Sequence, residues 1–98
     1  MEDTALNSDI HDSVWDALAD TQQEAANLKA RSALLYEIRK AVRSWDIPQE
    51  EAARRLGLTR PRTNDLLRGK LAKFSLDALV NIAASADLEI EIRVRQAA

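Results

Sequence analysis

The longest regular pattern in the sequence is an apolar stripe at helical spacing between residues 28 and 45. Thr21 and Glu24 precede it with the S/T-x-x-E spacing of a capping box, in which a threonine oxygen accepts a hydrogen bond from a backbone amide of the first turn. Pro48 disfavours helix at the residue before it, so a new element must start there. The pattern predicts a long helix from about Thr21 to about Ser44. Its apolar stripe consists of Leu28, Leu34, Leu35, Ile38, Val42 and Trp45.

Two shorter helices are expected between Pro48 and Gly69. The segment PQEEAARRLG has one small apolar face and ends at Gly57, which can adopt the positive φ of a tight turn. Thr59 can cap the next segment, RPRTNDLLR, and Gly69 is suited to end it. Pro61 lies near the start of this second helix, where the missing amide proton has no intrahelical acceptor.

A further helix is predicted after Ser75. Phe74, Ser75 and Leu79 occupy the N′, N-cap and N4 positions of a hydrophobic staple, in which the two apolar side chains contact each other across the cap. The apolar residues at helical spacing in this segment are Leu76, Leu79, Val80 and Ala83.

The stretch LEIEIRVR alternates between apolar and charged residues and therefore predicts a β-strand. No other segment of the chain has this pattern, so the backbone groups of the strand have no partner within their own subunit. We expect the strand to pair with its copy in a homodimer. The predicted interface residues are Leu88, Glu89, Ile90, Glu91, Ile92, Arg93, Val94 and Arg95.

Charge selects one register for this pairing. An antiparallel pair centred on Ile92 places Glu91 opposite Arg93 of the second copy. The same register places Glu89 opposite Arg95, so every acid faces a base. A shift of one residue centres Glu91 or Arg93 on its own copy, and like charges directly opposite each other are destabilising. The alternative is that the segment frays as a tail.

The first twenty residues form an acidic arm, of which the first dozen show no hydrophobic period and are expected to be disordered. Val14, Trp15 and Leu18 follow as a short apolar patch, too short to be a stable helix alone. The sequence therefore divides into an arm over residues 1–20, a helical domain over 21–86 and a strand with its tail over 87–98. The expected fold class is mainly α.

The formal net charge of −2 conceals a strong asymmetry. Residues 1–27 contain seven acids and no Lys or Arg, whereas residues 28–98 contain fourteen bases and nine acids. A basic body of this kind is typical of a protein that binds a polyanion, and an acidic arm indicates a separate role. The alternative interpretation of the arm is a solvated tail.

Other features exclude several classes of protein. The absence of cysteine excludes disulfides and thiolate metal sites and fits a reducing cytosol. No apolar run reaches the roughly 20 residues that span a bilayer, so we expect a cytoplasmic protein. His11 is the only histidine and has no catalytic partner near it in the sequence, and the two glycines lie twelve residues apart without forming a phosphate loop. We therefore expect no enzymatic activity, no metal and no cofactor.

The two short helices have the spacing of a helix-turn-helix. Gln49, Ala53, Gly57, Thr59 and Gly69 match the Q-x-x-x-A-x-x-x-G-x-[ST] pattern and the terminal glycine of lambda-repressor-like, or XRE-type, DNA-binding domains. The chain resembles this family, which implies a helical bundle whose second short helix enters the major groove. An ordinary helical hairpin is the alternative.

The resemblance implies specific roles by position. Arg60 follows the cap and could contact guanine, and Asn64 is suited to adenine. Asp65 could accept from cytosine or, as the preferred alternative, pair with Arg62 or Arg68. The full set of expected DNA-binding residues is Gln49, Thr59, Arg60, Arg62, Asn64, Asp65, Arg68, Lys70 and Lys73. Two departures from the family, Pro61 and Thr63, leave the base specificity open.

The layout over about residues 14–95, and most strongly from Pro48 to Val94, is also similar to the HigA-type antitoxins of bacterial toxin–antitoxin operons. This resemblance implies a dimeric repressor of its own operon that neutralises a small basic RelE/ParE-like ribonuclease. The residues of the arm expected to bind such a toxin are Val14, Trp15 and Leu18, unless Trp15 packs on the dimer itself. The alternative function is a stand-alone, prophage-type regulator without a toxin.

Overall fold

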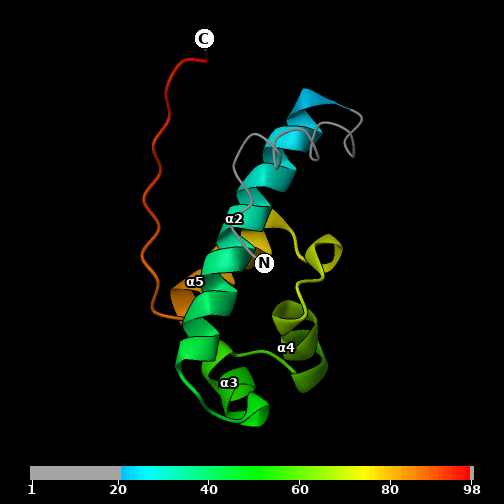
Figure 1. The fold of residues 1–98 in the computed structure, drawn as a ribbon, viewed down its shortest axis with the longest axis vertical. Helices are drawn as coiled ribbons and strands as arrows, with labels where there is room; N and C mark the ends of the chain where they lie inside the picture. The colour runs from blue at the N-terminus through cyan, green and yellow to red at the C-terminus, as the bar shows by residue number, and fades with distance from the viewer. Residues whose placement is uncertain (1–20, 98) are drawn as a thin grey trace.

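A computed structural model describes residues 21–97 of the chain, and Figure 1 shows that this part is a small helical bundle. The expected residues Val14, Trp15 and Leu18 lie outside the described range. The elements are α2 (Gln22–Ser44), α3 (Gln49–Leu56), α4 (Arg60–Leu67), the short 3₁₀ helix η1 (Leu71–Lys73) and α5 (Leu76–Ser85).

The long helix α2 begins and ends as its sequence predicts. The side-chain oxygen of Thr21 accepts a hydrogen bond from the backbone amide of Glu24 at 3.0 Å, which satisfies one donor of the first turn. Leu35, Ile38 and Val42 are buried on one face of the helix. The C-terminal half of α2 packs against the other helices, whereas its N-terminal end projects beyond them (Figure 1).

The three shorter α-helices all end in a left-handed residue that reverses the chain. Gly57 after α3 has φ 69°, Gly69 after α4 has φ 74° and Asp87 after α5 has φ 62°. In each case the next amide bonds back to a carbonyl of the last turn, for example Leu88 N to Ala83 O at 3.0 Å. The sequence predicted the two glycine ends, but not the aspartate end.

The core lies between α2, α3, α4 and α5. Phe74 and Leu79 are both buried in it, as the predicted hydrophobic staple requires, and the Ser75 side-chain oxygen accepts the amide of Ala78 and caps α5. The predicted apolar face of α5 was partly wrong, because Val80 is 40% exposed and Ile82 is buried instead. Ile82 lies one turn after Leu79, on the side that faces the core. The buried apolar residues are Leu35, Ile38, Val42, Ala52, Ala53, Leu56, Leu66, Phe74, Leu79, Ile82, Ala83 and Ala86.

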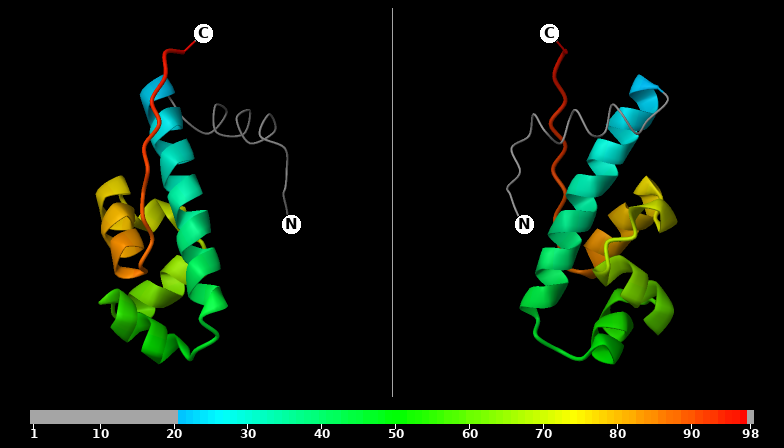
Figure 2. Two further views of the ribbon diagram at one scale, coloured as in Figure 1. Left: turned by 90° about the vertical axis from the view of Figure 1, so that its left-hand side faces the viewer. Right: turned by 45° about the vertical axis from the view of Figure 1, so that its right-hand side comes forward.

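The C-terminal segment, residues 88–97, runs back toward the N-terminal end of α2 in Figures 1 and 2. Within residues 21–97 the structure of the single chain contains no β-strand. Ile92 and Val94 are 83% and 85% exposed. The strand and its pairing in a dimer therefore remain predictions, and the segment leaves Ile92 and Val94 uncovered in the isolated subunit.

Candidate nucleic-acid interface

The turn between α3 and α4 has the geometry of a helix-turn-helix. Ala53 is buried where α4 packs on α3, and the small side chain allows this approach. The Thr59 side-chain oxygen accepts the amide of Arg62 at 3.2 Å and so caps α4. The hydroxyl of Thr63, which has no exposed surface, donates to the Thr59 carbonyl at 2.8 Å. This bond satisfies the buried hydroxyl and explains how a polar residue is accommodated at this core position.

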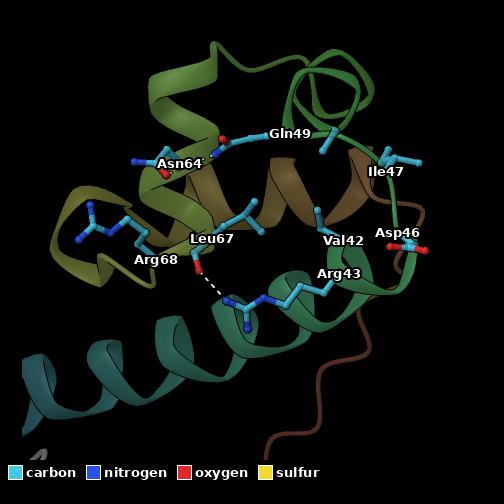
Figure 3. A pocket seen from close by; sticks show the side chains of 9 residues that line it. Val42, Arg43, Asp46, Ile47, Gln49, Asn64, Leu67 and Arg68 are labelled. Carbon is cyan, nitrogen blue, oxygen red and sulfur yellow. Dashed lines mark hydrogen bonds between the residues drawn. The ribbon is translucent and has the colours of Figure 1, made fainter.

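One face of α4 is open to solvent and carries Arg60 and Asn64, the two side chains suited to reading a base. Arg60, Asn64 and Arg68 are exposed and follow one another at intervals of four residues, so they lie along one side of the helix. In Figure 3 the side chain of Gln49, from the start of α3, points toward Asn64. Its Nε2 donates to Asn64 Oδ1 at 3.4 Å. This contact leaves the amide protons of Asn64 available to a ligand.

A hollow of about 470 Å³ lies beside this pair, between the end of α2, the start of α3 and α4 (Figure 3). Arg43 and Arg68 contribute cations to it, and Asp46 contributes one carboxylate. The sequence analysis did not predict Arg43 as part of this site, because nothing distinguishes it in the sequence except its basic side chain in the last turn of α2. Arg43 Nη2 donates to the Leu67 carbonyl at 2.9 Å.

Several arginines of α2 hold the end of α4 and the loop after it. Arg39 Nε donates to the same Leu67 carbonyl at 3.1 Å, and burial, with the nearby Arg43 guanidinium as a second cause, lowers the pKa of Arg39. Arg31 Nη1 donates to the carbonyls of Leu71 and Phe74 at 3.1 and 3.2 Å. Carbonyls at a helix end lack intrahelical partners, and cations there are favourable. Part of the basic excess is therefore structural.

The side chain of Arg62 makes contacts within its own chain. Its guanidinium carbon lies 4.1 Å from the centroid of the Phe74 ring, and Nη1 donates to the Lys73 carbonyl at 2.7 Å. The expected phosphate contact of Arg62 stays a prediction, and these bonds leave fewer of its donors for DNA.

The carboxylate of Asp65 faces the lysines of the following loop. It lies 3.4 Å from Lys70 Nζ and 3.7 Å from Lys73 Nζ. The preferred expectation that Asp65 pairs with Arg62 or Arg68 was therefore wrong, because the loop after Gly69 folds back and brings its lysines to the exposed side of α4. The two expected phosphate contacts, Lys70 and Lys73, thus share one acidic neighbour.

The described residues contain no group of three metal-ligating side chains, and none of their helices is long and apolar enough to cross a membrane. The fold and this surface define a helix-turn-helix protein of the DNA-binding regulator class. The sequence model of the family named Helix-turn-helix domain matches residues 17–95, and the chain belongs to this family. A comparison with curated proteins found none that matches the chain.

Proposed function

We propose that this protein is a sequence-specific repressor that binds double-stranded DNA as a homodimer. The observation that carries the proposal is the capped helix α4, whose solvent face presents Arg60 and Asn64 one turn apart. Arginine and asparagine side chains form bidentate hydrogen bonds with guanine and adenine, respectively, in the major groove. A helix supported on one side by the core and bare on the other fits that groove.

In this proposal the remaining polar residues position the protein on the duplex. Gln49, Thr59, Arg68, Lys70 and Lys73 contact phosphates, which fix the register but do not read sequence. Gln49 has a second task, because its hydrogen bond orients Asn64. Arg62 and Asp65 act mainly by holding the loop that carries the two lysines.

The C-terminal segment and the groove beside it support the proposed dimer. An apolar groove of about 530 Å³ lies between α2, α5 and residues 88–92, with Leu34 and Val80 among its walls. Glu37, Glu89 and Glu91 line the same groove, so a second strand that carries arginines complements it. The antiparallel register centred on Ile92 brings Arg93 and Arg95 of the second copy to that side. Two subunits related by a two-fold axis can place their α4 helices in major grooves about 34 Å apart.

We further propose that the protein is the antitoxin of a toxin–antitoxin operon. The similarity to HigA-type antitoxins supports this role, together with an arm in which Val14, Trp15 and Leu18 lie among acids. Such a segment is suited to fold onto a small basic protein. The alternative is a stand-alone regulator, which shares the DNA site and has no toxin.

The DNA proposal is tested by selecting bound fragments from a random duplex pool with the full chain. An enriched inverted repeat with half-sites about one helical turn apart is expected. Recovery of unrelated sequences, with binding that only follows salt concentration, would contradict sequence-specific repression.

The antitoxin role is tested separately by co-expression with any small basic protein encoded next to this chain. Copurification and relief of growth inhibition are expected, and both should be lost on deletion of residues 1–20, whereas operator binding is retained. A deletion that leaves neutralisation intact would count against the arm as the toxin-binding segment.

A further inference from the structure

One charged surface of α2 has no role in the proposed DNA contacts. Tyr36, Arg39, Lys40 and Arg43 follow the i, i+3, i+4, i+7 spacing and together line a shallow hollow of about 260 Å³. We name these four residues the α2 stripe. Tyr36 is 60% exposed, although it is a large aromatic side chain. Lys40 Nζ lies 5.3 Å from the centroid of the Tyr36 ring.

The stripe combines three cations with one aromatic ring, and its charges are weakly compensated. Lys40 forms one exposed ion pair, 3.2 Å from Glu37, and pairs of this kind contribute little. Arg39 and Arg43 use some of their donors on the Leu67 carbonyl and retain others. A surface of this composition fits a segment that carries carboxylates and an aromatic or apolar side chain.

The chain itself contains such a segment. Residues 1–20 include six acids and no Lys or Arg, and Asp12 and Asp16 flank Val14 and Trp15. The reach is sufficient. Tyr36 lies fifteen residues after Thr21, which corresponds to about 22 Å along the helix. An extended segment at about 3.3 Å per residue covers this distance in roughly seven residues, so Val14 and the residues before it can lie over the stripe, and Trp15 can reach Tyr36 with its side chain.

We propose that residues 9–15 bind across the α2 stripe of their own subunit, with the carboxylates of Asp9 and Asp12 on the cations and Trp15 against Tyr36. The apolar groove between α2 and α5 is a poorer site for this segment, because Glu37, Glu89 and Glu91 line it and repel its acids. The contact itself does not depend on the proposed function, whereas its effect on DNA binding rests on it.

Arg43 connects the α2 stripe with the proposed DNA-binding surface. It lines both the hollow of the stripe and the hollow beside Gln49 and Asn64. An acidic segment on the stripe therefore neutralises the edge of the DNA-facing surface and competes with phosphates for it. A partner that captures the arm would release this edge, which couples partner binding to DNA affinity.

Spin labelling of the full chain tests the contact, and the lack of cysteine makes the labelling site unique. The Ser13→Cys variant carries a nitroxide, and broadening of the backbone amide signals is measured by NMR at low salt. We expect the strongest broadening over residues 36–43 and its loss in high salt, since about 1 M salt reduces the screening length to roughly 3 Å. Even broadening along the chain, or broadening centred on Leu34 and Val80, would overturn the proposal.

A matched pair of variants identifies the cause. Lys40 and Arg54 are both exposed, and each lies 3.2 Å from a glutamate three residues earlier. Lys40→Glu should reduce the broadening about two- to five-fold, in line with the strength of exposed ion pairs, and Arg54→Glu should leave it unchanged. Equal effects would show a general influence of net charge and overturn the specific site.

Two controls exclude other occupants. Labelled chain mixed with isotopically labelled chain without nitroxide should show no broadening, because the contact lies within one subunit; broadening there would place the arm on another copy and overturn the proposal. If Lys40→Glu weakens DNA binding and leaves the nitroxide contact unchanged, the stripe binds the DNA backbone instead.

Discussion

The carboxylate of Asp65 illustrates how a single residue depends on its neighbours in space. It lies 20% exposed between Lys70 and Lys73, both of which come from the loop after α4. In the sequence its nearest cations at helical spacing are Arg62 and Arg68, and local spacing favoured them. The left-handed turn at Gly69 changes the direction of the chain and decides the actual partners.

Replacement of Asp65 by Asn should increase affinity for DNA of any sequence. The change removes one negative charge and leaves both lysines without their acidic partner, so the slope of log affinity against log salt should become steeper by about one unit. Salt-dependent binding to random and operator duplexes measures this. The control is Asp87→Asn, which makes the same charge change at the residue that follows α5. Equal slopes for both variants would show that only net charge matters.

Replacement of Arg60 by Ala should affect the operator selectively. The lost base contact should reduce operator affinity by about 1–3 kcal/mol, or roughly 5- to 150-fold, with a small change on random DNA. Arg54→Ala, which removes an exposed arginine from α3, should leave the ratio of the two affinities unchanged. A parallel loss on both kinds of DNA in Arg60→Ala would indicate a phosphate contact at this position.

At the scale of the elements, local sequence determined where most helices begin and end. Thr21, Thr59 and Ser75 each accept an amide of the first turn, as their spacing predicts. These bonds form between residues three positions apart, so no tertiary information is required. The buried face of α5 was less predictable, because Val80 and Ile82 are both apolar and only the packing against α2 and α3 decides between them.

Gly57 and Gly69 both have a positive φ, but only Gly69 has a side chain close to the position that a Cβ would take. A Cβ at Gly57 would meet nothing within 4 Å, whereas one at Gly69 would lie 3.0 Å from Arg39 Nη1. Gly57→Ala should therefore lower the free energy of unfolding by about 1–2 kcal/mol through the left-handed conformation alone. Gly69→Ala should cost more, because the Arg39 guanidinium must also move from its position near Leu67.

Urea denaturation of both variants measures these costs. In an Arg39→Ala background the additional cost of Gly69→Ala should disappear, while that of Gly57→Ala stays the same. Equal costs at the two glycines in the unmodified chain would contradict the role of the Arg39 contact.

At the scale of the whole molecule, the exposed C-terminal segment predicts self-association. Glu91→Arg places arginine opposite Arg93 of the second copy, and such like-charge pairs are destabilising. The dimer should weaken, and the double variant with Arg93→Glu should restore it, because the two charges are exchanged. Sedimentation equilibrium across a concentration series measures both. Variants that associate as strongly as the parent would show that the register is wrong.

The sequence by itself determined most of the helix boundaries, the turn at Gly57 and the residues on the open face of α4, because caps, left-handed turns and helical periodicity depend on residues only a few positions apart. The tertiary structure alone decided that Arg39 and Arg43 bind the end of α4, that Arg62 packs on Phe74 and that Asp65 faces two lysines. These contacts join segments that only the folded chain brings together. The identity of a charged residue does not specify which distant carbonyl, ring or ion it will contact.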